Sequence, residues 1–199
     1  MQQPVESFRE APRTGRRSDG VAECHLFERE QKVGARLDPE SRNRRFSGGA
    51  SDDFIRRHAH LARGVGVVLY GFFVDGTLRG ASELRHVGSP LAGEAEAALS
   101  VEQSWQSRGV GTELLRCTLL TARNRGIKSL HMHCLADNRR MQQLARKFAA
   151  DFSFDFGSVT GNLLPPRSTA LSMAREALAD GHAFANAIFD AQSRLLGAA

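Results

Sequence analysis

The chain has 199 residues, of which 41% are hydrophobic and 25% charged, a length and composition typical of a single globular domain. The net charge of +5 suits a polyanionic partner without identifying it. No stretch is long and apolar enough for a membrane-spanning helix, and the polar N-terminal region lacks a secretory pattern. The three cysteines follow no metal or disulfide spacing, so we expect reduced thiols in a cytoplasmic protein with no membrane partner.

Polar residues fill the first part of the chain. Residues 1–20 contain Pro, Gly and Arg without periodicity, so we expect a flexible leader. Residues 22–29 are predicted to form a strand, and the segment LDPESRNRRF, residues 37–46, is predicted to be helical. Ser51, followed by two aspartates, has the pattern of a helix N-cap. The apolar face expected for this second helix consists of Phe54, His58 and Leu61.

A hairpin follows these helices. Residues 67–74 and 77–85 have strand patterns on either side of Asp75-Gly76, which is a strong two-residue turn signal. Residues 94–101 (EAEAALSV) predict a further strand. A helix predicted over residues 110–125 carries an apolar stripe and begins after a turn that contains glycines.

The second half of the chain continues the alternation of strands and helices. Residues 127–135 predict a strand, and Asp137 or Asn138 caps the next helix. The aromatic residues that alternate as in a half-buried strand are Phe152, Phe154 and Phe156. A last strand is expected over residues 158–164, before two prolines and a helical tail. This order predicts a mixed α/β sheet with a strand–helix–strand crossover.

The most informative segment is VEQSWQSRGVGTELL, residues 101–115. It places Gln106, Gly109 and Gly111 at a strand–helix junction, where glycines let a ligand approach the backbone closely. The first amides of a helix have no partner inside it, and the helix dipole favours an anion there. The segment therefore predicts a cradle for a diphosphate. It is not a P-loop, because no Gly-Lys-Ser/Thr follows, and it is not a dinucleotide fingerprint, because Leu114 replaces the third glycine.

Gln106-x-x-Gly109-x-Gly111, with a strand before it and a strand and an Asn138-capped helix after it, resembles the acyl-CoA pyrophosphate motif of the GNAT superfamily of N-acetyltransferases. LDPESRNRRF is similar to the helical entry of the GNAT domain in bacterial protein-lysine acetyltransferases. The resemblance implies the α/β GNAT fold, with a mixed sheet of about six or seven strands, a splayed strand pair and flanking helices. We expect an acyl-CoA-binding domain over residues 21–166 and a helical C-terminal extension over residues 167–199.

The resemblance also implies acetyl-CoA as the acyl donor. In the family, the strand matching residues 95–101 is bulged and parts from the strand matching residues 127–135, so that pantetheine lies between them. Asn138 matches an asparagine that contacts the cofactor arm and is also a helix cap. Arg139 or Arg140 either reaches the ribose phosphate or belongs to a solvated face. The cofactor-binding residues expected on this basis are Leu99, Ser100, Val101, Gln106, Ser107, Arg108, Gly109, Val110, Gly111, Thr112 and Asn138.

Acetyl transfer to an amine needs a group that accepts a proton, because an ammonium cannot attack a thioester. Glu96 is the preferred base, since its position is similar to that of a glutamate in the protein-acetylating subgroup; the alternative is a surface carboxylate. His133 is the second candidate, and the alternative is a structural histidine. Many GNAT enzymes place a general-acid tyrosine where this chain has Ala145. His131 and His133 lack further ligands at a suitable spacing, so no metal is expected.

These features predict an acetyl-CoA-dependent N-acetyltransferase that acts by direct transfer in a ternary complex. The acceptor is a primary amine of a small molecule, or a lysine or N-terminus of a protein. The alternative is an acyl-CoA-binding sensor with the same fold and no efficient turnover. Nucleic acid is not an expected partner, because no helix-turn-helix, zinc or RNP-type motif is present. The helical tail, residues 167–197, either covers the acceptor side or forms the seam of a homodimer.

Overall fold

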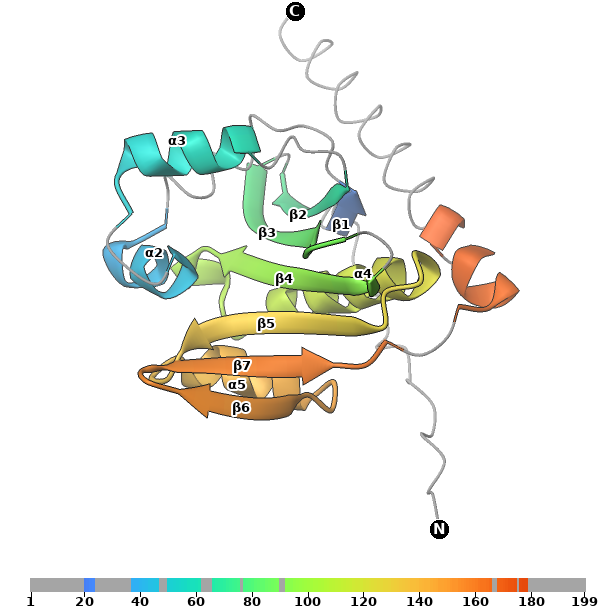
Figure 1. Cartoon of the computed structure of the whole chain (residues 1–199). Coiled ribbons are helices and arrows are strands. Elements are labelled where there is room, and N and C mark those ends of the chain that lie inside the picture. The colour runs from blue at the N-terminus through green and yellow to red at the C-terminus, as the bar shows by residue number, and fades with distance from the viewer. Residues whose placement is uncertain are drawn as a thin grey trace, which may run out of the picture.

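The computed structural model describes residues 20–23, 37–46, 50–61, 66–75, 77–89, 92–165, 168–174 and 176–178. Within these residues seven strands form one mixed sheet in the order β1-β2-β3-β4-β5-β7-β6 (Figure 1). The strands are β1 (Gly20–Glu23), β2 (Val67–Val74), β3 (Thr77–His86), β4 (Glu94–Val101), β5 (Ser129–Leu135), β6 (Asp151–Asp155) and β7 (Ser158–Leu163). The helices are α2 (Pro39–Phe46), α3 (Asp52–Leu61), α4 (Val110–Asn124) and α5 (Arg139–Arg146), with a short 3₁₀ helix η2 (Gln103–Trp105). The expected mixed sheet with flanking helices is confirmed.

The predicted hairpin is formed by β2 and β3. Val74 pairs with Thr77, so the loop between the strands holds residues 75 and 76 only. The first strand differs from its predicted range, because β1 covers Gly20–Glu23. Residues 24–29, the greater part of the strand expected there, lie outside the described residues.

β4 and β5 are parallel neighbours that separate along their length. Their pairing is limited to residues 94–96 against residues 129–131, and the two arrows diverge toward their C-terminal ends in Figure 1. β4 remains paired with β3 in one constant register from Ala95 to Val101. The bulge expected in β4 is therefore absent from its pairing with β3. Because β4 and β5 pair only at their N-terminal ends, they leave a wedge at the C-terminal end of β4.

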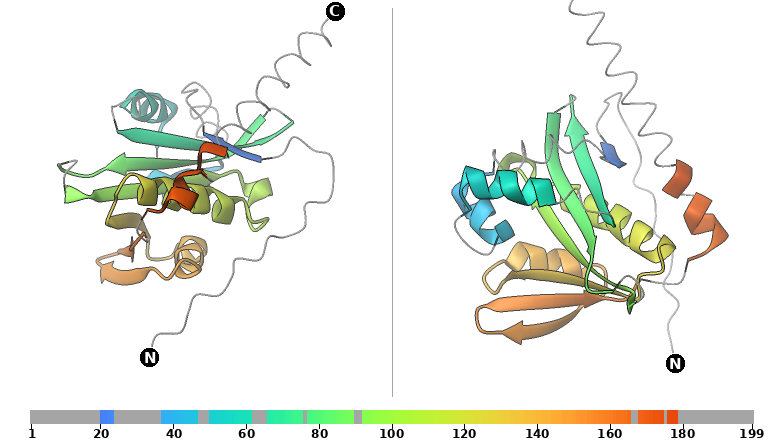
Figure 2. Two further views of the ribbon diagram at one scale, coloured as in Figure 1. Left: turned by 90° about the vertical axis from the view of Figure 1, so that its right-hand side faces the viewer. Right: turned by 45° about the horizontal axis from the view of Figure 1, so that its top comes forward.

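The two faces of the sheet have different surroundings. α4 and α5 lie behind the sheet in the view of Figure 1 and cover its apolar face. The core on that face includes Leu84, Ala95, Ala97, Leu114, Leu115, Leu130, Met132 and Leu163. Glu96 and Ala98 alternate with Ala95 and Ala97, so they point to the opposite face. α2 and α3 contact each other through Phe46 and Phe54 and lie next to each other in the right-hand view of Figure 2.

The phenylalanines of β6 correct one expectation. Phe152 is half-buried and packs against the core, but Phe154 is 70% exposed and Phe156 is fully exposed. β6 is the last strand of the sheet, after β7, and Phe156 follows it in the turn. The prediction that all three rings belong to a half-buried strand is therefore wrong, because only Phe152 packs against the core.

The described part of the C-terminal tail packs against the C-terminal end of α4. Glu176 accepts hydrogen bonds from Thr121 (2.5 Å) and Asn124, and Ser172 Oγ donates to Asn124 Oδ1 (2.6 Å). This contact lies on the side of the molecule away from α2 and α3 (Figure 2). The second predicted tail helix, around Phe184, lies outside the described residues. No helix in the described ranges has the length and apolar character needed to cross a membrane.

Candidate active site

The turn that leads into α4 presents a row of backbone amides. Ser107 has φ = 58° and Gly109 has φ = 87°, and Gly109 occupies the N-cap. The first backbone bond into the helix runs from the amide of Glu113 to the carbonyl of Gly109 (3.0 Å). Among the described residues, no backbone acceptor takes a hydrogen bond from the amides of residues 107–112 outside the helix's own bonds, and the N-cap has no side-chain bond. Amides without a protein partner at the positive end of a helix dipole can bind an anion.

A cavity of about 400 Å³ lies beside these amides, at the C-terminal end of β4. Its walls come from α2, the end of β4, the start of α4 and α5. The predicted cofactor residues that line it are Leu99, Ser100, Val101, Gln106, Ser107, Gly109, Gly111, Thr112 and Asn138. Two predicted residues do not line it. Arg108 lies over the ring of Trp105 (5.1 Å to the centroid), and the side chain of Val110 is buried in the core.

Gln106 joins three walls of this cavity. Its Nε2 donates to the carbonyl of Val101 (3.0 Å) and to Ser41 Oγ (3.2 Å), and its Oε1 accepts from Arg140. The end of β4, α2 and α5 are thereby held to one another. The side chain of Gln106 shapes the cavity through these bonds, and the sequence alone gave no indication of them.

Of the two residues predicted as the cap of α5, Asp137 and Asn138, the structure shows Asn138 at the N-cap. Its Oδ1 accepts a hydrogen bond from the amide of Met141 (3.2 Å), and the residue is buried. Because Asn138 also lines the cavity, the cap fixes a wall of the cavity at the same time.

Sequence reasoning missed the contribution of α2 to this cavity. Arg44 and Arg45 line it together with Arg140 and Lys147, which gives the cavity four cationic side chains. Asp38, which caps α2 by accepting from the amide of Ser41 (2.9 Å), also lines it. The hydrogen bonds from Ser41 lower the pKa of Asp38. The arginine run in LDPESRNRRF was the available signal, but only the fold shows that it reaches the wedge.

A second cavity of about 220 Å³ adjoins the first, because Arg44, Arg45, Leu99 and Met141 line both. Glu96 and His133, the two groups singled out as candidate bases, line it with Ala98. Its other walls are Phe46 and Phe54 on α2 and α3, together with His58. The structure thus brings both candidate bases to one hollow, next to the cavity that has the amide row.

The two histidines of β5 share the open face of the sheet. The rings of His131 and His133 are stacked with centroids 6.5 Å apart. His131 Nδ1 bonds Asn162 (2.7 Å) and His133 Nδ1 bonds Thr160 (2.9 Å), both on β7. Within the described residues, no three His, Cys, Asp or Glu side chains lie close enough together to hold a metal ion.

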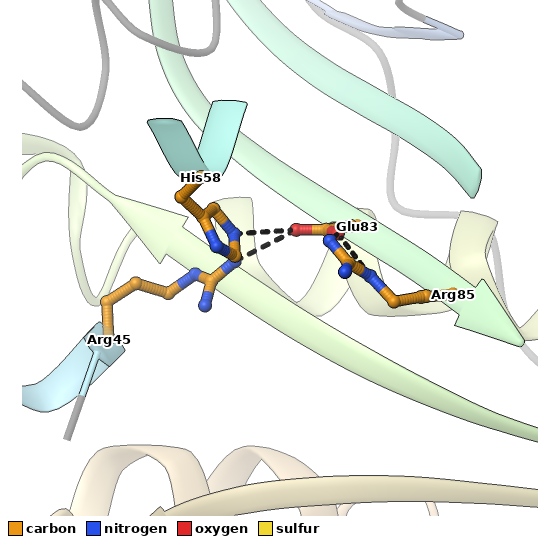
Figure 3. Close-up of polar contacts among 4 residues, drawn as sticks. All are labelled: Arg45, His58, Glu83 and Arg85. Carbon is orange, nitrogen blue, oxygen red and sulfur yellow. Dashed lines mark hydrogen bonds and ion pairs between the residues drawn. The ribbon is translucent and has the colours of Figure 1, made fainter. Parts of the chain in front are cut away.

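A buried carboxylate ties α2 and α3 to β3 beside the second cavity (Figure 3). Glu83 is 4% exposed and contacts Arg45 (3.1 Å), His58 (3.4 Å) and Arg85 (Nε to Oε1, 3.0 Å). Burial by itself raises the pKa of a carboxyl. The hydrogen bonds from His58 and Arg85 and the charges of Arg45 and Arg85 outweigh that effect, so the pKa of Glu83 falls to about 2.

No tyrosine hydroxyl that could act as a general acid lies at either of two positions considered. The position at which the resemblance implies a tyrosine is occupied by Ala145, which is buried and has no hydroxyl. Tyr70 lies on the other face of the sheet, with its hydroxyl bonded to Thr121 of α4.

Cys134 is buried opposite His133, as predicted, and burial raises the pKa of its thiol.

The mixed sheet with one separated pair of parallel strands, and the row of amides at the start of α4, match the arrangement expected for the GNAT fold. Residues 35–150, more than half of the chain, match the family model described as acetyltransferase (GNAT) family. The chain belongs to the GNAT acetyltransferase family. No individual curated protein matches the chain.

Solved structures agree with this assignment at the level of the fold. The GNAT domain of PAT from S. lividans has a TM-score of 0.64 and 24% identity, covering 73% of this chain and 90% of that domain. YncA from Salmonella typhimurium, a putative acetyltransferase solved with acetyl-CoA, has a TM-score of 0.58 and 12% identity, covering 77% and 97%. PaiA N-acetyltransferase from Thermoplasma acidophilum, solved with coenzyme A, has a TM-score of 0.54 and 16% identity, covering 73% and 99%.

Proposed function

We propose that the chain is an acetyl-CoA-dependent N-acetyltransferase that acetylates a primary amine by direct transfer. The observation that carries the proposal is the row of amides at residues 107–112, open to a cavity that adjoins a second one lined by Glu96 and His133. A diphosphate bound to the amides would thus lie in the cavity next to the one that holds two groups able to accept a proton. The acceptor is an amine on a small molecule, or a lysine or N-terminus of a protein.

The residues of the first cavity fit acetyl-CoA. The amides of residues 107–112 would hold the diphosphate, with positive charge supplied by Arg140 and Lys147. The wedge beside Leu99, Ser100 and Val101 would hold the pantetheine arm, because β5 does not pair with this part of β4. When bound, acetyl-CoA supplies a thioester carbon that a neutral amine can attack.

The second cavity suits the acceptor. Lysine-type ammonium groups have a pKa near 10.4 in water, so the amine must lose a proton before it attacks. Glu96 is the first candidate for that task and His133 the second, and both line the cavity. Backbone amides of β4 that face the wedge would stabilise the developing oxyanion.

Calorimetry and thiol release test the proposal together. The chain should bind acetyl-CoA and release CoA thiol with at least one member of a panel made of Nα-acetyl-lysine amide, spermidine, a lysine-containing peptide and a peptide with a free N-terminus. Absence of acetyl-CoA binding would contradict the proposal entirely.

One observation favours a second candidate function, that of an acyl-CoA sensor. The buried Ala145 takes the place of the general-acid tyrosine, so the leaving thiolate has no protein hydroxyl at that position. A sensor would bind acetyl-CoA in the calorimeter and release no thiol with any amine of the panel.

A further inference from the structure

A third titratable side chain, His58 of α3, lies in the second cavity. The sequence indicated it only as part of an apolar helix face, but it lines the same hollow as Glu96 and His133. Its ring is stacked on Phe54 (centroids 6.2 Å apart) and meets Phe46 edge-on (5.4 Å). The side chain is 24% exposed, so the ring is held in place and still reaches the open space.

Glu83 fixes the tautomer of this ring. A carboxyl with a pKa of about 2 is ionised at neutral pH, and an ionised carboxylate only accepts hydrogen bonds. Nε2 of His58, 3.4 Å from Glu83 Oε2, must therefore carry the hydrogen. In the neutral ring the remaining nitrogen, Nδ1, has a free lone pair and is a proton acceptor. A carboxylate that orients an imidazole in this way is the arrangement found behind general bases.

Charged groups of both signs surround His58. Glu83 is shared with two guanidinium groups, Arg45 on α2 and Arg85 on β3, so one negative charge faces two positive ones (Figure 3). Arg44 also lines the cavity, and Glu96 and His133 face it from β4 and β5. Whatever the balance of these charges, a base takes up a proton only in its neutral form.

The strand register brings this cluster next to Glu96. Arg85 is the direct cross-strand partner of Glu96, and Glu83 is the partner of Ala98. Side chains of directly opposed residues lie on one face with Cβ atoms about 5 Å apart. His58, bonded to Glu83, and Glu96 therefore approach the second cavity from adjacent positions.

We propose that His58 takes the proton of the acceptor ammonium, with Glu83 as its positioning residue and Glu96 as the carboxylate that binds the ammonium beforehand. The proposal rests on the proposed function and specifies the acceptor side of that site. The ammonium gives one proton to Nδ1 of His58. The neutral nitrogen then forms the new N–C bond as the C–S bond breaks, and it loses its second proton to water while the thiolate gains one. The imidazolium returns its proton to solvent through the open cavity.

Imidazoles suit this task better than carboxylates, because their ordinary pKa lies near neutral pH. The test is the pH dependence of kcat/KM for the best amine of the panel named above. His58→Gln should lower kcat/KM at pH 7 about 100-fold and remove the rising limb near neutrality, with an unchanged Kd for acetyl-CoA. His131→Gln is the matched control, because His131 shares the sheet face but bonds Asn162. It should retain the wild-type profile.

Glu83→Gln distinguishes positioning from mere structural support. Loss of the carboxylate removes the acceptor of the Nε2 hydrogen, so the ring should lose its fixed tautomer and kcat should fall, while the KM of the amine and the Kd of acetyl-CoA stay unchanged. Nitrogen-15 NMR of the His58 ring should show a mixture of the two tautomers in place of one, without any turnover. A purely structural role would lower the rate without changing the tautomer of the ring.

The outcomes separate the two levels of the proposal. If the wild-type protein binds no acetyl-CoA or acetylates no amine, the proposed function fails and this assignment fails with it. If the wild-type protein is active and His58→Gln keeps both the rate and the rising limb, only the role of His58 is overturned. In that case Glu96→Gln should remove the rising limb of the pH dependence of kcat/KM, and Glu96 would be the base.

Discussion

Gly111, in the first turn of α4, faces Leu144 of α5. A Cβ built there would lie 3.4 Å from Leu144 Cδ2, an ordinary contact, so a side chain can be added without breaking the fold. Glu at this position would put a negative charge where the diphosphate belongs. Two like charges about 4 Å apart repel by about 4 kcal/mol near a protein surface.

Gly111→Glu should therefore weaken acetyl-CoA binding at least 100-fold, as measured by calorimetry. Gly111→Gln has the same shape without the charge and is the control. If the two variants bind acetyl-CoA equally well, the diphosphate does not lie against these amides. Thermal unfolding of both variants near the wild-type temperature would show that the loss is one of binding.

Glu96 gives a second prediction for a single side chain. Because it lines the cavity proposed for the acceptor, Glu96→Gln should lower kcat/KM for the amine 10- to 100-fold, the order of a lost acid–base or charge contact. The Kd of acetyl-CoA should not change. Glu94→Gln, two residues earlier on the same face, is the control, because Glu94 does not line either cavity. Equal kinetics of the two variants would exclude Glu96 from the reaction.

Local signals explain which site residues the sequence could predict. The amide row depends on Gly109 and on the start of α4, which are neighbours in the chain. The sequence of this short segment is therefore enough to predict it. Glu83 depends on Arg45, 38 residues away, and on His58, 25 residues away. No local pattern marks such a contact, because only the pairing of β3 with β4 and the packing of α2 and α3 create it.

Among the elements, α2 and α3 are both joined to β3 by the carboxylate of Glu83. The pKa of Glu83 falls from an ordinary 4.5 to about 2 in the folded chain. A lowered folded-state pKa contributes stability that is complete above about pH 4.5 and is lost as the pH falls toward 2. The shift corresponds to about 3 kcal/mol.

The free energy of unfolding of the wild-type protein should therefore exceed that of Glu83→Gln most at pH 7, and the difference should shrink between pH 4.5 and pH 2. Urea unfolding followed at pH 7, 4 and 3 measures it. Glu40→Gln is the control, because Glu40 is mostly exposed in its pair with Arg44, and exposed pairs contribute at most about 1 kcal/mol. A constant difference across this pH range would contradict the role of the charge.

Most elements followed from hydrophobic period and turn signals. The β2–β3 hairpin, α4, β5, α5 and β7 lie close to their predicted ranges, because each has its own local pattern. The exposed Phe154 shows the limit of such patterns. Alternation indicates that two rings lie on the same face of a strand. It does not indicate how far along the strand other residues cover that face, and in β6 the cover ends after Phe152.

For the molecule as a whole, the described part of the tail supports α4 from the side opposite the cavities. Glu176→Ala removes acceptors for Thr121 and Asn124, and hydrogen bonds to a charged group contribute about 1.5–3 kcal/mol each. The variant should unfold at a lower temperature while its Kd for acetyl-CoA is unchanged. Met173→Ala, an exposed change in the same segment, should have little effect. A loss of acetyl-CoA affinity in Glu176→Ala would place the tail within the binding machinery.

The two described cysteines have a consequence for steady-state kinetics. Cys117 and Cys134 are both buried, and Cys134 alternates with His133, so its thiol points to the helix-covered face, away from the acceptor cavity. Neither thiol can store the acetyl group as a covalent intermediate between two half-reactions. Double-reciprocal plots for the donor at several fixed amine concentrations should therefore give intersecting lines, whereas parallel lines would demand a nucleophile elsewhere in the chain.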